Sequence, residues 1–207
     1  MRTAIITSGS HIAVGGRSGA RRTFVTAVLL LAGLMPGFIV SASDDVRQAP
    51  DVVVEEAHGL YSVTARFHVP QTPATVLTVL TNYEQIPRFM PDVKTSVVLE
   101  RTAGRAVVEQ EAVSRLLMFS KRVHLVLEIT ETAATVRFRD QCGKSFSLYE
   151  GMWSMSAQDG GTDIRYELRA RPSFGMPEAI LTRLLRRDSG RMIESLRQEI
   201  ASTANER

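Results

Sequence analysis

The chain has only one cysteine, Cys142, among its 207 residues. A single thiol cannot form a disulfide within the chain, so internal cross-links do not hold the fold together. A folded part of about 165 residues is large enough to bury a sufficient hydrophobic core without them. No histidine lies near Cys142 in the sequence, and we interpret it as a small, partly buried side chain and not as a nucleophile.

Acidic residues are missing from the first 42 positions, which carry Arg2, Arg17, Arg21 and Arg22. Without these four arginines the 25 Lys and Arg fall to 21, against 22 Asp and Glu, and the formal charge changes from +3 to −1. Binding to nucleic acid requires clustered cations. The remaining chain has no such excess, so we expect no nucleic-acid partner.

A long uninterrupted hydrophobic run is also missing. Residues 24–40 are apolar, but Gly33 and Pro36 interrupt them, and a membrane-spanning helix needs about 20 consecutive apolar residues. A basic segment, this apolar segment and small residues ending at Ala42 follow one another in the order of a secretory signal. We therefore predict that residues 1–42 are a signal peptide of a periplasmic or secreted protein, against the alternative of an uncleaved anchor.

The basic segment resembles a twin-arginine export signal at Arg21 and Arg22. That pattern usually has Ser or Thr before the arginines, where this chain has Ala20, and often has Lys at the position of Thr26. Both twin-arginine and ordinary export therefore stay open. Residues 43–51 are mostly polar, and we expect a flexible leader over residues 43–53.

Alternation of apolar and polar residues dominates the rest of the chain. In residues 60–69, for example, Tyr61, Val63 and Ala65 share one face, and such a period of two is typical of a half-buried strand. This pattern predicts seven strands, at residues 60–69, 93–101, 105–114, 122–131, 135–140, 146–156 and 164–171. Because the connections are short and rich in turn residues, we expect the strands to be antiparallel.

Two short helices are predicted after the first of these strands. Thr72 followed by Pro73 is a typical helix start, and an apolar stripe continues from there to about Asn82. Pro87 and Pro91 follow, and they allow only a turn of helix between them.

The last segment changes its period. Apolar residues recur at intervals of three and four from Ile180 to Ile200, after Pro177 and Glu178, which predicts a long amphipathic helix. Gly190 lies near its centre, and a glycine there costs up to roughly 1 kcal/mol relative to alanine. We therefore expect a kink or a break at this point.

Together these elements predict one α+β domain over residues 54–204. A sheet of seven antiparallel strands has one apolar face to cover, and the C-terminal helix is the only predicted element long enough to cover it. A strongly twisted sheet curls around such a helix. The expected fold is a curved seven-stranded antiparallel sheet around a long C-terminal helix, with two short helices after the first strand.

Two segments of this domain resemble a known superfamily. Residues 82–91 read Asn-Tyr-Glu-Gln-Ile-Pro-Arg-Phe-Met-Pro, and residues 149–155 read Tyr-Glu-Gly-Met-Trp-Ser-Met, followed by a Gly-Gly-Thr turn and Tyr166. They are similar to the SRPBCC superfamily, whose helix-grip fold START lipid-transfer domains, birch-pollen-allergen-like proteins and aromatase/cyclases share. The resemblance is closest to the coenzyme Q-binding and polyketide cyclase/dehydrase branch. It implies a cavity for an apolar ligand between sheet and helix.

Eight aromatic and apolar side chains are the candidates for the wall of this cavity. They are Tyr83, Phe89, Met90, Trp153, Met155, Tyr166, Leu181 and Leu185. Tyr83 and Phe89 either gate the cavity or lock the short helices onto the sheet edge, and Trp153 either stacks on a ligand or anchors the core. Methionines give an adaptable apolar surface, which suits a promiscuous pocket and ordinary core packing alike.

No catalytic constellation stands out from the sequence. His58, His68 and His124 are isolated, and the spacings of a metal site, a phosphate loop and a nucleophile elbow are absent. Glu109 and Glu111 share one strand face, and we expect them to face solvent. The prediction is therefore no catalytic residue, no metal and no cofactor.

The leading hypothesis is a non-enzymatic protein that binds or transports an apolar small molecule, such as a lipid or a quinone, outside the cytoplasm. The alternative is a cyclase/dehydrase-type enzyme, which needs convergent polar groups inside the same cavity. A third is a protein whose cavity has closed and which works through its surface. The basic stretch Arg183, Arg186, Arg187 and Arg191 suits peripheral contact with anionic lipid or a solvated helix face.

Overall fold

The computed structural model describes residues 51–90, 92–116 and 119–205. They belong to the second of two compact units of the chain, which begins at Val46. The predicted signal peptide and positions 43–50 of the predicted leader lie outside the described residues.

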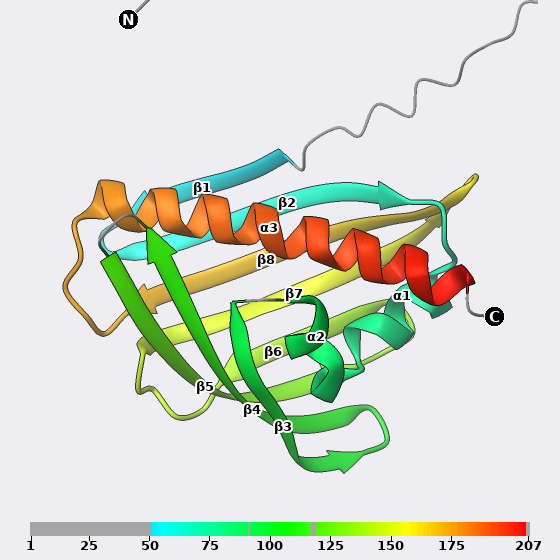
Figure 1. Cartoon of the computed structure of the whole chain (residues 1–207), viewed down its shortest axis with the longest axis horizontal. Helices are drawn as coiled ribbons and strands as arrows, with labels where there is room; N and C mark the ends of the chain where they lie inside the picture. Colours follow the sequence, from blue (N-terminus) through cyan, green and yellow to red (C-terminus); the bar gives the residue numbers. More distant parts are fainter. Residues whose placement is uncertain (1–50, 91, 117–118, 206–207) are drawn as a thin grey trace, which may run out of the picture. The chain divides into compact units, whose positions relative to one another are not determined.

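Eight strands form one antiparallel sheet in the described part of the chain (Figure 1). They are β1 (Asp51–Ala57), β2 (Leu60–Val69), β3 (Val93–Thr102), β4 (Arg105–Leu116), β5 (Phe119–Glu131), β6 (Thr135–Asp140), β7 (Phe146–Gln158) and β8 (Gly161–Pro172). Their order across the sheet is β1-β2-β8-β7-β6-β5-β4-β3. Only the β2–β8 pair joins strands that are not consecutive in the chain, so the prediction of an antiparallel sheet with short connections is confirmed.

The strand that the sequence prediction missed is β1, which raises the number of strands from seven to eight. It begins at Asp51, so the last three residues of the expected flexible leader belong to a strand. β1 pairs with β2 along its whole length, from Asp51 opposite Arg66 to Ala57 opposite Leu60. The turn is the two residues His58 and Gly59, with φ of 53° and 76°. Two positive φ angles are what a tight hairpin turn requires, and they match the twist of the flanking strands.

The two predicted short helices are present between β2 and β3. Helix α1 spans Pro73–Leu80, and the short 3₁₀ helix η1 (Tyr83–Gln85) leads into α2 (Ile86–Phe89). The hydroxyl oxygen of Thr72 accepts a hydrogen bond from the backbone N–H of Thr75 at 3.4 Å, which confirms the predicted helix start.

The C-terminal helix α3 (Glu178–Asn205) runs without a break through Gly190, so the expected break there is wrong. Ile193, Leu196 and Ile200 on one side of Gly190 are fully buried, and Leu184 on the other side is only 4% exposed. Burying such side chains stabilises by roughly 1.5–3 kcal/mol each, which outweighs the weak helix propensity of one glycine.

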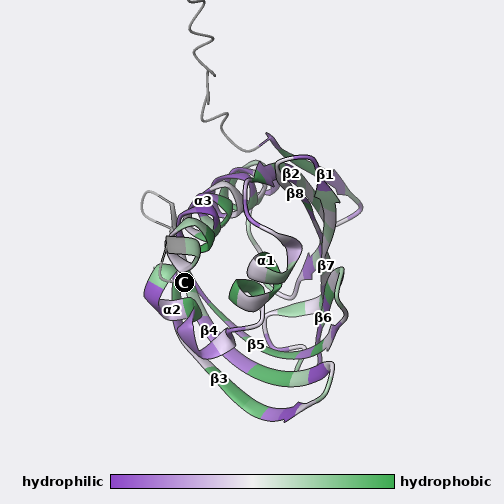
Figure 2. Cartoon of the chain, turned by 90° about the vertical axis from the view of Figure 1, so that its right-hand side faces the viewer, coloured by the Kyte–Doolittle hydropathy of each residue, from purple (hydrophilic) through white to green (hydrophobic). Residues whose placement is uncertain are grey.

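The sheet curves around the helices, with its concave face toward α1 and α3 (Figure 2). α3 contacts β1, β2 and β4, and α1 contacts α3, β7 and β8. In β5 the side chains of Leu125, Leu127 and Ile129 are buried, as the alternation predicts. The α+β helix-grip architecture expected from the sequence is thus confirmed, apart from the additional strand.

Candidate functional site

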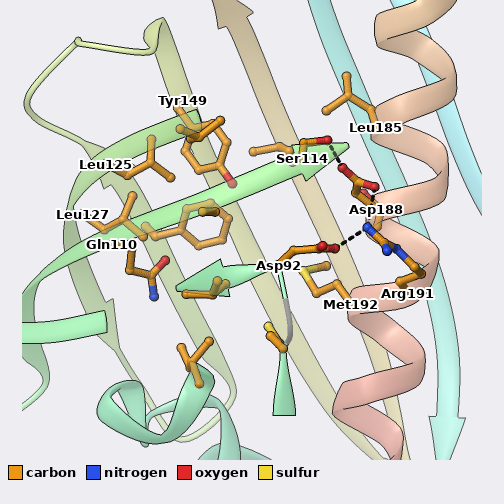
Figure 3. Close-up of a pocket in the computed structure, with 18 of the residues that line it drawn as sticks. Asp92, Gln110, Ser114, Leu125, Leu127, Tyr149, Leu185, Asp188, Arg191 and Met192 are labelled. Atoms are coloured by element: carbon orange, nitrogen blue, oxygen red, sulfur yellow. Dashed lines mark hydrogen bonds and ion pairs between the residues drawn. The ribbon is translucent and has the colours of Figure 1, made fainter. Parts of the chain in front are cut away.

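A cavity of about 300 Å³ lies between the concave face of the sheet, the short helices and α3 (Figure 3). Its position follows from the arrangement of the elements, because a strongly curved sheet leaves space that one helix does not fill. The volume is at the lower end of the range usual for small-molecule sites, roughly 300–1,000 Å³.

One wall of the cavity is aromatic. Its rings come from β6, β7 and β8 and the segment after β8, and they belong to Phe138, Phe146, Tyr149, Trp153, Tyr166 and Phe174. Neighbouring rings are in contact: the ring centroids of Trp153 and Tyr166 are 4.4 Å apart, and those of Phe146 and Tyr149 are 4.9 Å apart. Such tilted arrangements are favourable for aromatic pairs.

The other walls are aliphatic. β5 contributes Leu125, Leu127 and Ile129, and α1 contributes Val79 and Leu80. Helix α3 adds Leu181, Leu184, Leu185, Met192 and Leu196. The alternation of β5 and the three-and-four spacing of α3 direct these side chains to the same space.

The structure brings most of the predicted cavity candidates together. Seven of the eight line the cavity, namely Tyr83, Phe89, Met90, Trp153, Tyr166, Leu181 and Leu185. Met155 does not. It is 6% exposed and packs in the core one inward-facing position beyond Trp153 on β7.

Tyr83 holds η1 against the sheet. Its hydroxyl group donates a hydrogen bond to Oε1 of Glu131 at 2.7 Å, and the guanidinium of Arg101 lies 5.3 Å above its ring. Arg101 also forms an ion pair with Glu131 at 3.4 Å. Burial and the neighbouring Glu131 carboxylate raise the pKa of Tyr83 far above its usual value. These contacts favour the locking role over the gating role for this residue.

A group of charged and polar side chains lines the cavity where α3 faces the ends of β3 and β4. Asp188 on α3 accepts a hydrogen bond from the hydroxyl of Ser114 on β4 and pairs with Arg191 at 3.0 Å. Arg191 also forms an ion pair with Asp92, which precedes β3 (Figure 3). Arg191 is 47% exposed and the two aspartates are 26% and 35% exposed, so this group, the rim network, borders solvent.

A second polar feature of the cavity is a pair of tyrosines in the aromatic wall. The hydroxyl groups of Tyr149 and Tyr166 lie close enough to interact with each other. Burial raises the pKa of Tyr149 to about 12, assisted by the nearby Asp140 carboxylate. Burial likewise raises the pKa of Tyr166 well above its usual value. Both hydroxyls therefore stay protonated at neutral pH and act as hydrogen-bond donors.

Sequence reasoning missed the rim network and Tyr149 for different reasons. Asp92 and Arg191 are 99 residues apart in the chain, and no local pattern links them. Tyr149 had a visible signal, because it lies four residues before Trp153 on β7 and therefore shares its face.

Two histidines that look isolated in the sequence have partners on the surface. His124 lies 3.5 Å from Glu109 and 3.8 Å from Glu111, and His68 pairs with Asp163 at 2.8 Å. Glu109 and Glu111 alternate along β4 with the cavity-lining Gln110 and therefore face away from the cavity. Among the described residues, no group of three or more acidic, histidine or cysteine side chains could hold a metal ion.

Helices long and apolar enough to cross a bilayer are absent from residues 51–205, leaving aside the three undescribed positions 91, 117 and 118.

Solved structures with the same fold include lipid-transfer and cyclase proteins. The STAR-related lipid transfer protein from Xanthomonas axonopodis has a TM-score of 0.56 and 16% identity, over 74% of this chain and 99% of that chain. The Zhui aromatase/cyclase from Streptomyces sp. R1128 has a TM-score of 0.59 and 13% identity, over 69% of this chain and 94% of that chain. A START superfamily protein from Mycobacterium smegmatis has a TM-score of 0.58 and 16% identity, over 68% and 97% of the two chains. At these identities the likeness establishes the fold alone.

The sequence itself gives a family assignment. No curated protein sequence matches the chain. The sequence model described as "polyketide cyclase / dehydrase and lipid transport" matches residues 69–197, which is more than half of the chain. This match confirms the resemblance seen in residues 82–91 and 149–168. The chain therefore belongs to the polyketide cyclase/dehydrase and lipid transport family.

Proposed function

We propose that the protein binds and carries an apolar small molecule, such as a lipid or a quinone, in its internal cavity outside the cytoplasm. The observation that carries the proposal is the cavity of about 300 Å³ with aliphatic side chains on most sides and aromatic rings on one. Removing an apolar ligand from water into such a site is favourable in proportion to the apolar area that is buried.

The polar groups of the cavity support carriage more than catalysis. Asp92 and Asp188 are paired with Arg191, and the hydroxyl of Tyr83 is bound to Glu131. A general acid or base works best with a pKa near the operating pH, whereas the tyrosines have pKa values that are raised away from it. These pairings and the raised pKa values of the tyrosines support a binding role for the cavity.

A cyclase- or dehydrase-type activity is the second candidate. It is favoured by the hydroxyls of Tyr149 and Tyr166 inside the cavity and by the aromatase/cyclase among the similar structures. Returning an extracted ligand to the purified protein separates the two candidates. Recovery of the ligand unchanged supports carriage, and a cyclised or dehydrated product that Tyr149→Phe abolishes supports the enzyme.

Binding is tested with N-phenyl-1-naphthylamine, a neutral apolar probe whose fluorescence rises in an apolar site. Ala112 lines the cavity from β4, so Ala112→Phe places a ring in the space that the ligand needs. Leu99→Phe is the matched control, because Leu99 is 51% exposed on β3.

The wild-type chain and Leu99→Phe are expected to bind the probe with saturation, and Ala112→Phe is expected to lose this binding. Equal binding by Ala112→Phe would show that the probe lies elsewhere and would contradict the proposal. Adding a ring to a filled core destabilises by roughly 1–3 kcal/mol. An unchanged unfolding temperature of Ala112→Phe would therefore support an open cavity.

Export is supported by the basic, apolar and small-residue order of residues 1–42. Contact with anionic membrane lipid has weaker support. Arg183 and Arg186 are exposed on α3, but Arg187 and Arg191 pair with Asp188, which neutralises part of the basic stretch. The proposed partner is thus the apolar ligand, and peripheral membrane contact would serve its delivery.

A further inference from the structure

We propose that Tyr149 is a specificity-determining residue, which selects ligands that present a carbonyl or similar hydrogen-bond acceptor oxygen to the aromatic wall. This inference rests on the proposed function and sharpens it from any apolar molecule to a carbonyl-bearing one. Its basis is the position of the Tyr149 hydroxyl in the cavity and the number of protons in the tyrosine pair.

The hydroxyl of Tyr149 is directed into the cavity. Figure 3 shows the side chain of Tyr149 among those that line the pocket, with its oxygen toward the middle of the drawn group. Both tyrosines line the cavity, but Tyr149 is only half-buried, whereas Tyr166 is 3% exposed. A ligand in the cavity therefore meets the hydroxyl of Tyr149 more readily than that of Tyr166.

The hydroxyls of Tyr149 and Tyr166 carry one proton more than a single hydrogen bond between them needs. Two neutral hydroxyls carry two protons, and the hydrogen bond between them takes up one. Either hydroxyl can donate that bond. Since Tyr166 is only 3% exposed and Tyr149 is the more accessible of the two in the cavity wall, the arrangement in which Tyr166 donates leaves the proton of Tyr149 for a ligand. The described residues provide no other hydrogen-bond partner for the hydroxyl of Tyr149.

A hydrogen-bond donor in an apolar site discriminates between ligands that carry an acceptor oxygen and ligands that lack one. A buried hydroxyl without an acceptor is unfavourable, and a ligand oxygen at this position removes that penalty. A bond that Tyr149 already accepts from Tyr166 also strengthens the bond that it donates. The ring centroids of Phe138 and Phe146 lie 5.9 Å and 4.9 Å from that of Tyr149. These neighbouring rings favour a planar group next to the carbonyl.

The test compares two probes of the same shape by isothermal titration calorimetry. 2-Acetylnaphthalene has a carbonyl oxygen where 2-isopropenylnaphthalene has a CH₂ group, and both carry the same planar ring. Each is titrated into the wild-type chain, into Tyr149→Phe and into Tyr61→Phe. Tyr61 is the matched control, because it is 5% exposed in the core and does not line the cavity.

The wild-type chain and Tyr61→Phe are expected to bind the ketone about five-fold more tightly than the alkene, as one neutral hydrogen bond predicts. Tyr149→Phe is expected to bind both probes with the affinity that the wild-type chain has for the alkene. Equal affinities in the wild-type chain, or a ketone preference that survives in Tyr149→Phe, would overturn the role of Tyr149 and leave the proposed cavity binding intact. Failure of both probes to bind would instead count against the proposed function and this inference together.

Discussion

The ring of Phe138 lies where a side chain at position 151 would stand: a Cβ atom on Gly151 would be 2.4 Å from Cζ of Phe138. The two residues are register partners on β6 and β7. The ring centroid of Phe138 lies 5.9 Å from that of Tyr149 and 6.4 Å from that of Tyr166. A cross-strand aromatic ring over a glycine protects the bare backbone. Gly151 thus allows the aromatic wall to lie against the sheet and keeps the cavity free.

Replacing Gly151 by alanine is expected to destabilise the fold by roughly 1–3 kcal/mol, as overpacking of a core does. The added methyl group would also meet the backbone oxygen of Glu167 at 2.4 Å, and a backbone atom in a sheet cannot move away cheaply. Chemical denaturation measures the change. The double variant Gly151→Ala, Phe138→Leu should recover only part of the loss, because the oxygen of Glu167 remains. A Gly151→Ala chain as stable as the wild type would contradict this packing.

Replacing Gly190 on α3 by alanine is expected to change the stability in the opposite direction. Apart from the backbone of its own helix and its two chain neighbours, a Cβ atom there would meet nothing within 4 Å, and the helix is continuous on both sides. Alanine at position 190 is therefore expected to raise the free energy of unfolding by about 0.5–1 kcal/mol. The same denaturation experiment measures this gain and serves as the matched control for Gly151→Ala. A loss of stability would mean that the helix bends at this residue after all.

The four tyrosines of the chain are predicted to resist ionisation as long as it is folded. Tyr61, Tyr83, Tyr149 and Tyr166 all have pKa values raised above 10, with burial as the largest cause, and Tyr149 reaches about 12. A titration that follows the near-ultraviolet absorbance of tyrosinate should show little ionisation at pH 10 in the native chain. In guanidinium chloride about half of the groups should be ionised at that pH. Ionisation with a midpoint near 10 in the native chain would refute the burial of these side chains.

The free energy of unfolding should depend on pH because of the same ionisation of tyrosine side chains. A group whose pKa is higher in the folded than in the unfolded chain stabilises fully below the unfolded value, and this contribution is lost as the pH rises through the folded value. For Tyr149 the window extends from about pH 10 to about 12. The free energy of unfolding is therefore expected to fall in this range, and to fall less steeply in Tyr149→Phe. Identical slopes in the two chains would exclude Tyr149 as a source of the effect.

Cleavage of the proposed signal peptide predicts a defined N-terminus for the exported chain. Mass spectrometry of the exported fraction should give a chain that begins at Ser43, after the small residues that end the predicted signal. Leu30→Arg places a charge in the apolar segment and should leave the uncleaved chain in the cytoplasm. Ser10→Arg adds the same charge outside that segment and should not change export. An exported chain that keeps residues 1–42 would support the uncleaved anchor instead.

The periodic parts of the fold could be predicted from the sequence because burial on one face imposes a period on the residues. Leu125, Leu127 and Ile129 alternate along β5, and α3 repeats at three and four, so both elements and their inner faces are evident. Strand β1 is less evident. Only Val54 of its three consecutive valines is buried, and its pairing with β2 depends on the turn at His58 and Gly59.

The site could be predicted only in part, because its shape depends on contacts between distant residues. Tyr83 and Trp153 stand out as large side chains in recognisable segments, and both line the cavity. Met155 shares the inward face of Trp153, but whether that face borders a cavity or packed core changes along the strand. The contact of Arg191 with Asp92 forms only when the sheet and the helix are folded, and no periodic pattern in the sequence indicates it.

Native mass spectrometry of the full chain, purified without detergent or organic solvent, tests the claim that the cavity holds an apolar ligand. The expected spectrum shows a complex that exceeds the mass of the chain by one small molecule. Extraction with organic solvent should release this molecule, and Ala112→Phe should lack it while Leu99→Phe retains it. The bare chain mass in every preparation, together with an experimental structure in which side chains fill the space between β5, β7 and α3, would contradict the claim.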